Sequence, residues 1–179
     1  CIKKITRRSK YILIFFNDTN VLLIHLGMTG RFYYTKTNGR KFNTSFYNNT
    51  NIINKHDHLK IKFGKFSLIY NDVRKFGFIK RIQKKNVVTS NHLSRLGCEP
   101  LSNKFCFNYL KSKILNKKSS IKNLLMNQSI VAGLGNIYVN ETLYFCKIHP
   151  EKKGYKKVDK DIRKLISVIK KILKNAIIA

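Results

Sequence analysis

Met28 stands between two glycines, directly after an apolar run, in the string His25-Leu-Gly-Met28-Thr-Gly30. Glycines at this spacing predict a tight turn that directs the methionine outward. An outward methionine could act as an apolar wedge, which some nucleic-acid-binding proteins insert between base steps. The alternative is a methionine that folds back onto the core.

A second turn combines two cations, an aromatic ring and a glycine in Asn71-Asp-Val-Arg74-Lys-Phe76-Gly-Phe78. The guanidinium of Arg74 and the ring of Phe76 are two residues apart, so both could join one base stack. The cation would pair with an orphaned base or a phosphate while the ring stacks. The alternative is an ordinary hairpin in which Phe76 and Phe78 point into the sheet.

A glycine-rich turn precedes a helical segment in Val131-Ala-Gly-Leu-Gly-Asn136-Ile-Tyr138. A helix that begins at Asn136 would present free backbone N–H groups and the positive end of its dipole, which suits a phosphate. The string lacks the third glycine of a dinucleotide-binding fingerprint and follows a helix, so it does not indicate that class.

Histidines and lysines provide further candidate phosphate ligands. Lys10 ends a basic string just before an apolar strand, where its ammonium can reach outward. In Lys55-His56-Asp57-His58, two histidines flank a carboxylate. A metal site there would need a third group of ligands, which the sequence does not offer, so no metal ligand is predicted. We expect instead a histidine that donates to a phosphate, with Asp57 orienting its ring.

The composition restricts the class of protein. The 179 residues contain 37 Lys and Arg against 8 Asp and Glu, a formal charge of +29. Such a charge favours a polyanion, most commonly nucleic acid. Hydrophobic residues make up 43% of the chain, which argues against global disorder. No apolar run reaches the roughly 20 residues of a membrane span, and the four cysteines form no Cys-x-x-Cys pair. We expect an intracellular chain with reduced thiols and no membrane partner.

The elements that would position these residues change character along the chain. Strands are predicted over residues 11–16, 21–26, 31–34, 58–63, 66–70 and 76–82, with a hairpin turn at Asn38-Gly39. Helices are predicted over 108–116, 120–127, 136–146 and 158–178, the last with lysines opposite an apolar face. The pattern predicts an antiparallel sandwich or barrel followed by a helical domain.

Six strings together resemble formamidopyrimidine-DNA glycosylase, a family of bacterial base-excision enzymes for oxidised purines. They are Arg7-Arg-Ser-Lys10-Tyr11, His25-Leu-Gly-Met28-Thr-Gly30, Lys55-His56-Asp57-His58, Asp72-Val-Arg74-Lys-Phe76-Gly77, Leu96-Gly-Cys-Glu-Pro-Leu101 and Gly133-Leu-Gly-Asn136-Ile-Tyr138. The resemblance extends along the whole chain and implies an α+β fold, with an antiparallel β-sandwich followed by a helix-two-turn-helix domain. We assign residues 1–86 to the carboxyl-terminal part of the sandwich and 87–179 to the helical DNA-binding domain.

The resemblance also implies roles for individual residues. Met28, Arg74 and Phe76 would fill the gap left when a damaged nucleotide is flipped out. Lys10 would be the catalytic residue of this chain, near the lesion phosphate, where it assists elimination. The residues expected to hold the DNA backbone are His25, His56, Arg74, Lys118 and Asn136, with Lys122 near the same strand.

The sequence departs from the family pattern at several positions. The family nucleophile is the α-amine of an amino-terminal proline, whereas this sequence begins at Cys1, and the family zinc finger would lie beyond Ala179. We therefore expect an internal fragment that lacks both termini, with no cofactor of its own and zinc in the finger of the whole protein. Val73 replaces a proline and Lys75 an arginine, and the lysine cannot bind a phosphate in bidentate fashion.

The expected function is a DNA repair glycosylase with abasic-site lyase activity. It would excise 8-oxoguanine and formamidopyrimidines from duplex DNA, as a monomer in the bacterial cytoplasm or in an organelle of bacterial origin. The fragment alone would bind DNA but be inactive in excision. The alternatives are a non-catalytic damaged-DNA-binding paralogue and a basic ribosomal or RNA-binding protein. A membrane-surface role for residues 158–178 also matches their charge.

Overall fold

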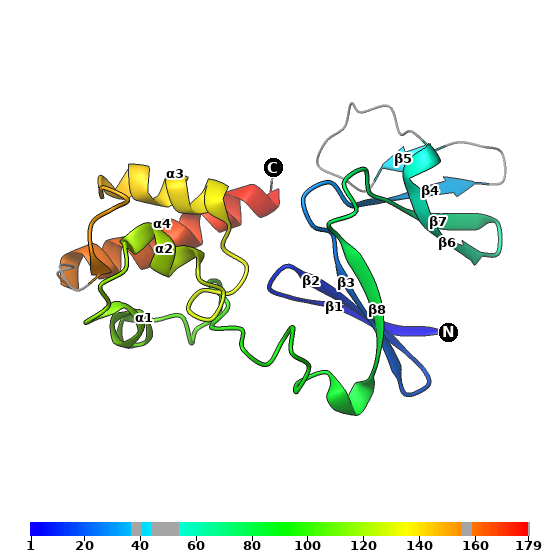
Figure 1. Cartoon of the computed structure of the whole chain (residues 1–179), viewed down its shortest axis with the longest axis horizontal. Coiled ribbons are helices and arrows are strands. Elements are labelled where there is room, and N and C mark those ends of the chain that lie inside the picture. Colours follow the sequence, from blue (N-terminus) through cyan, green and yellow to red (C-terminus); the bar gives the residue numbers. More distant parts are fainter. Residues whose placement is uncertain (37–40, 44–53, 155–158, 179) are drawn as a thin grey trace. The chain divides into compact units, whose positions relative to one another are not determined.

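The computed structural model describes residues 1–36, 41–43, 54–154 and 159–178, which form two compact units (Figure 1). The first unit holds residues 1–7 and 11–84, and the second holds residues 8–10 and 85–179. The prediction divided the chain between residues 86 and 87. It did not anticipate that the short segment 8–10 groups with the helical unit.

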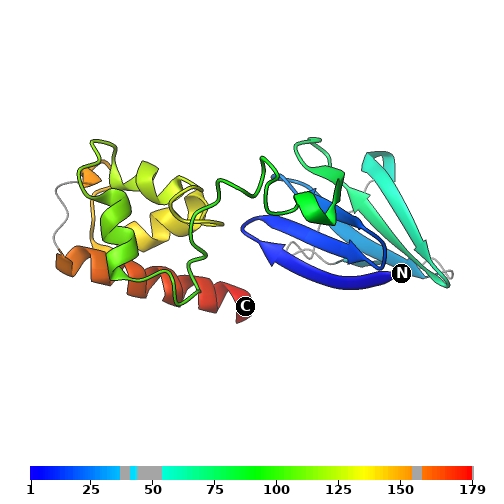
Figure 2. The ribbon, with the colours of Figure 1, turned by 90° about the horizontal axis from the view of Figure 1, so that it is seen from below.

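The first unit is a sandwich of two antiparallel four-stranded sheets, as predicted (Figures 1 and 2). One sheet has the order β1 (Ile2–Arg8), β2 (Tyr11–Phe16), β3 (Asn20–His25) and β8 (Phe78–Gln83). The other has the order β5 (Lys41–Asn43), β4 (Arg31–Lys36), β7 (Phe66–Asn71) and β6 (Asp57–Phe63). Two short 3-10 helices, η1 (Asn54–His56) and η2 (Lys84–Asn86), precede β6 and follow β8.

The central strands carry the apolar core of the sandwich. Leu13, Val21, Leu23, Ile24 and Tyr33 are almost fully buried. This burial explains why the β-branched and aromatic runs of the sequence form strands here. The predicted Asn38-Gly39 turn lies outside the described residues.

The strand prediction differs from the structure by one or two residues at several strand ends and in two missed strands. The last strand begins at Phe78 rather than at residue 76, because Phe76 belongs to the exposed turn before it. Neither β1 nor the three-residue strand β5 was predicted. Both lie at the edge of a sheet, and β1 exposes most of its side chains, lysines included, so it lacks the apolar signature of a buried strand.

The second unit contains four described helices around one apolar core. They are α1 (Phe107–Ile114), α2 (Ile121–Met126), α3 (Asn136–Cys146) and α4 (Asp159–Ile178). The core includes Phe105, Leu110, Ile121, Leu125, Leu134, Val139, Leu165 and Ile169. The bounds of α3 are those predicted, and α2 is capped at Ser120, whose hydroxyl accepts the N–H of Asn123.

The long helix α4 buries one face and exposes the other. Ile162, Leu165 and Ile169 pack into the core of the helical unit, so this apolar face is not available for insertion into a membrane surface. No helix in the described part of the chain is long and apolar enough to span a bilayer.

Candidate nucleic-acid interface

Met28, Arg74 and Phe76 form one exposed cluster in the first unit. Met28 is 71% exposed and Phe76 is 56% exposed. Nη1 of Arg74 lies 3.3 Å from the sulfur of Met28, and the guanidinium carbon lies 4.4 Å from the centre of the Phe76 ring. Met28 therefore does not fold back onto the core, and Phe76 does not point into the sheet. Both alternatives considered from the sequence are wrong.

The two turns that carry this cluster pack backbone against backbone. Gly27 has a φ of +64°, and a Cβ atom placed on it would lie 2.7 Å from the nitrogen of Gly77. A Cβ on Gly77 would in turn lie 2.7 Å from the carbonyl oxygen of His25. Real Cβ atoms do not approach so closely, so both positions require glycine.

Asp72 lies beneath the cluster and is fully buried. Its Oδ1 accepts the hydroxyl of Thr29 at 2.5 Å and the N–H of Arg74 at 3.3 Å. Its Oδ2 accepts the N–H of Gly77 at 2.8 Å and the hydroxyl of Tyr70 at 3.1 Å. Asp72 was not among the predicted site residues, although it is one of only eight acidic residues.

The hydrogen bonds around Asp72 favour its ionised form. Burial by itself would raise the pKa of this carboxyl. The donors from Thr29, Gly77, Tyr70 and Arg74 outweigh that effect and hold the pKa of Asp72 below its ordinary value. Burial and the bond to the same carboxylate raise the pKa of the Tyr70 hydroxyl, which therefore stays protonated as a donor.

His25 is the last residue of β3 and leads into the Met28 turn. Its Nδ1 accepts the N–H of Gly27 at 3.1 Å, so a neutral ring carries its proton on Nε2. The ring stacks on Phe78, with 5.8 Å between centroids and 18° between planes, and lies 5.1 Å from the ring of Tyr11. These contacts fix the ring in a tautomer that can donate to a phosphate oxygen.

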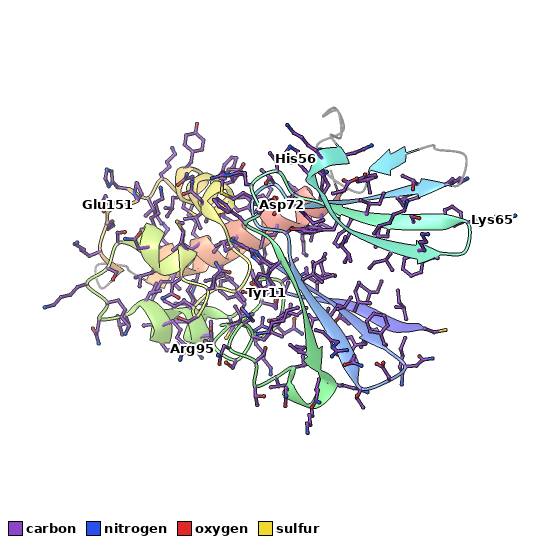
Figure 3. All side chains as sticks on the ribbon, turned by 45° about the vertical axis from the view of Figure 1, so that its right-hand side comes forward. Tyr11, His56, Lys65, Asp72, Arg95 and Glu151 are labelled. Carbon is purple, nitrogen blue, oxygen red and sulfur yellow. The ribbon has the colours of Figure 1, made fainter. Side chains whose placement is uncertain are left out.

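His56 and Asp72 lie at the end of β6 and β7 opposite Lys65 (Figure 3). The carbonyl of His56 accepts the N–H of Asp72 at 3.0 Å. The expectation that Asp57 orients a histidine is wrong, because its carboxylate accepts from Tyr33 and Asn71 instead. Nε2 of His58 lies 2.8 Å from the carbonyl of Asp72 and must carry the proton, since a carbonyl only accepts.

Lys10 lies beside the amino end of α3 in the helical unit. Its Nζ is 3.3 Å from the position that a Cβ would take on Gly135, the residue that caps the helix. Asn136, the first helical residue, is exposed, and no side chain caps the helix. The free N–H groups, the dipole and the ammonium thus face one small region. Partial burial lowers the pKa of Lys10 below its ordinary value.

Two residues that the sequence analysis missed hold the segment that ends at Lys10. Oε1 of Glu99 accepts a hydrogen bond from the guanidinium of Arg8 at 2.8 Å and another from the N–H of Ser9 at 2.6 Å. Oε1 of Gln128 accepts the N–H of Gly133 at 2.8 Å and the hydroxyl of Ser9 at 3.3 Å. The side chain of Gln128 therefore connects the segment before Lys10 to the glycine turn before α3.

The remaining predicted contacts surround α2. Lys118 is exposed in the loop before the Ser120 cap, and Lys122 is half-buried in the first turn of the helix. In the described part of the chain, no three His, Cys, Asp or Glu side chains gather as a metal site would require, and the four cysteines form no disulfide. The predicted DNA contacts thus divide between the two units. The sandwich holds His25, His56, Met28, Arg74 and Phe76, and the helical unit holds Lys10, Lys118 and Asn136.

Comparison with known protein families accounts for both units. Residues 1–79 match the formamidopyrimidine-DNA glycosylase N-terminal domain, and residues 96–179 match the formamidopyrimidine-DNA glycosylase H2TH domain. The chain belongs to the formamidopyrimidine-DNA glycosylase family. The helical unit described above is accordingly the helix-two-turn-helix domain of this family.

Individual glycosylases of the family resemble the chain along almost its whole length. The formamidopyrimidine-DNA glycosylase of Rickettsia bellii is 41% identical over 99% of this chain and 61% of its own length. The Lactococcus lactis formamidopyrimidine-DNA glycosylase, solved in non-covalent complex with DNA that contains an abasic site, has a TM-score of 0.84 at 36% identity. That match covers 98% of this chain and 63% of the other.

A second structure of the Lactococcus lactis glycosylase, in complex with DNA containing a formamidopyrimidine-dG lesion, is equally similar. Its TM-score is 0.84 at 36% identity, over 98% of this chain and 62% of the other. The chain therefore spans just over 60% of the length of the glycosylases that it matches.

Proposed function

We propose that this chain carries the gap-filling and phosphate-binding parts of a DNA repair glycosylase. The whole protein excises oxidised purines, such as 8-oxoguanine and formamidopyrimidines, from duplex DNA and cleaves the resulting abasic site. The proposal rests on the family of the chain and on the geometry of its two units.

The observation that carries the proposal is the contiguous exposure of Met28, Arg74 and Phe76. Met28 and Phe76 are both more than half exposed and lie on adjoining turns, and contiguous exposed apolar surface marks an interaction site. The two apolar side chains and the guanidinium between them suit the gap that remains in a base stack after one nucleotide has been flipped out.

The phosphate contacts come from both units. His25 carries a donor on Nε2, and the amino end of α3 offers N–H groups beside Asn136 and Lys10. Such contacts orient a protein on DNA without reading its sequence, as a search for damage requires. The net charge of +29 adds a general attraction to the duplex.

Lys10 is the residue of this chain that we assign to the chemistry. In the reaction, a terminal amine displaces the base at C1′ and forms an imine, and β-elimination then breaks the strand. An ammonium of lowered pKa near the lesion phosphate can stabilise the leaving phosphate and exchange a proton there. The amine nucleophile of the family is a proline, and the only prolines of this sequence are Pro100 and Pro150. The 179-residue polypeptide alone is therefore expected to bind damaged DNA without excising a base.

Zinc is proposed only for the finger of the whole protein. Zinc in a finger with four cysteine ligands would supply folding energy rather than chemistry. No described residues of this chain form a suitable ligand group, so none is assigned to it. The protein is proposed to act as a monomer in the bacterial cytoplasm or in an organelle of bacterial origin.

Competition binding at physiological salt tests the proposal. We expect the 179-residue chain to bind a duplex with a tetrahydrofuran abasic analogue at least about tenfold more tightly than the intact duplex of the same sequence. Duplex RNA should compete less well than either. Equal affinity for abasic and intact DNA would contradict the proposal, and a preference for RNA would favour the ribosomal or RNA-binding alternative.

Excision distinguishes the enzyme from a non-catalytic paralogue. The whole protein, incubated with an 8-oxoguanine duplex and borohydride, is expected to form a covalent adduct through its imine. Tight abasic-site binding by a whole protein that forms no adduct and releases no base would favour the paralogue.

A further inference from the structure

Asp72 contacts both of the turns that carry the exposed cluster. Thr29, from the turn of Met28, donates to Oδ1, while Gly77, from the end of the turn of Arg74 and Phe76, donates to Oδ2. Thr29 and Asp72 are 43 residues apart in sequence, so this carboxylate is a long-range connection between the β3–β4 turn and the β7–β8 turn, each of which passes from one sheet to the other.

The number of donors matches what a carboxylate can accept. An ionised Asp has two oxygens with about four lone-pair sites and no donor. The four groups that donate to Asp72 are the hydroxyls of Thr29 and Tyr70 and the backbone N–H groups of Arg74 and Gly77. A carboxylate therefore satisfies every donor that surrounds it.

The hydroxyl of Thr29 is shared with the opposite turn. It donates to Asp72 and at the same time lies 3.2 Å from the N–H of Arg74, which it can accept. The close approach of Gly27 to Gly77 leaves little space between the two backbones. The position of Met28 is thus linked to that of Arg74 through Thr29 and Asp72.

We propose that Asp72, acting through Thr29, is a positioning residue that locks the Met28 turn to the Arg74–Phe76 turn, so that the three exposed side chains enter the DNA gap as one rigid unit. This inference rests on the proposed function, because it concerns how that cluster recognises a gap. Rigidity matters here because side chains already held in the bound geometry lose less entropy on insertion.

A matched pair of substitutions at Thr29 isolates the connection. Thr29→Val keeps the shape of the side chain and removes the hydroxyl, whereas Thr29→Ser keeps the hydroxyl. Thr19→Val, at an exposed threonine of the β2–β3 turn in the same unit, is the control for loss of a threonine hydroxyl. The full chain is used throughout, and thermal unfolding verifies that each variant folds.

The first readout is the ratio of affinities for the tetrahydrofuran duplex and the intact duplex. We expect Thr29→Val to lower this preference about fivefold, a change of about 1 kcal/mol, because the Met28 turn is no longer held to Asp72 before insertion. Thr29→Ser and Thr19→Val should stay within about twofold of the wild type, a change of about 0.4 kcal/mol. A Thr29→Val chain that is less stable but keeps the wild-type preference would overturn the proposal, as would an equal loss in Thr29→Ser.

The second readout depends on insertion itself. The fluorescence of a 2-aminopurine beside the tetrahydrofuran site rises when the bound protein unstacks this base. We expect Thr29→Val to reduce that rise in fluorescence. In a Met28→Ala background, Thr29→Val should change the affinity ratio less than about twofold, because the two residues act through one contact. Fully additive effects would overturn the proposal. If the wild type itself shows no abasic preference, the proposed function fails instead.

Discussion

The guanidinium of Arg74 lies 4.4 Å from the centre of the Phe76 ring and 3.3 Å, at Nη1, from the sulfur of Met28. One cation thus contacts both apolar members of the exposed cluster. Its planar group can stay stacked on Phe76 while its N–H groups face an orphaned base or a phosphate. This arrangement makes the geometry of the side chain as important as its charge.

Arg74→Lys separates these two properties. The lysine keeps the charge but loses the planar group, so we predict an affinity for abasic duplex about fivefold lower and a nearly unchanged salt dependence. Arg74→Ala should lose affinity and also lower the salt slope by about one. Binding titrations at several salt concentrations measure both quantities. A lysine variant equal to the wild type would show that charge alone matters.

Lys118 has a different expected signature. It is exposed before the Ser120 cap, and its proposed contact is with a phosphate rather than with the gap. Lys118→Gln should therefore weaken binding to abasic and intact duplexes by the same factor and lower the salt slope by about one. Lys65→Gln, at the turn between β6 and β7, is the control with the same change of charge (Figure 3). A loss confined to the abasic duplex would refute the assignment.

The lowered pKa of Asp72 should make the free energy of unfolding depend on pH. Its folded-state pKa is held below the ordinary value near 3.9, so its stabilising contribution is complete above about pH 4 and is lost as the pH falls further. Asp72→Asn should cost about 1.5 to 3 kcal/mol at pH 7, since it disturbs hydrogen bonds to a charged group. Chemical unfolding at pH 7, 5 and 3 measures the difference.

The difference between wild type and Asp72→Asn should be the same at pH 7 and at pH 5, and smaller at pH 3. Glu151→Gln, at an exposed acid of the helical unit, serves as the comparison (Figure 3). A difference that grows as the pH falls would mean that the carboxyl is protonated in the folded protein.

Local patterns were sufficient to predict much of the fold. The bounds of α3 follow from the glycine turn and Asn136, and the exposure of Met28 follows from its flanking glycines. The start of β8 was harder to place. Phe76 alternates with Phe78 in the sequence as though in one strand, but β7 ends in one sheet at Asn71 and β8 begins in the other sheet only at Phe78.

The connections between distant residues could not be predicted from one sequence. Asp72 has no signature of its own, because its partner Thr29 lies on another turn, 43 residues away in the sequence. Gln128 likewise joins Ser9 to Gly133 only after the chain has folded. Tertiary contacts of this kind decide the role of a polar side chain, whereas short motifs decide only the local backbone.

Substitution of Met28 tests the central claim most directly, because the account assigns this side chain to the gap. Affinities of wild type and Met28→Ala for the tetrahydrofuran duplex and its intact counterpart are compared at one salt concentration. We predict about a tenfold loss on the abasic duplex, about 1.4 kcal/mol, and less than about a twofold loss on the intact one. Val88→Ala, at another exposed apolar residue, should change neither. Equal losses on both duplexes, or no loss on the abasic one, would contradict the account.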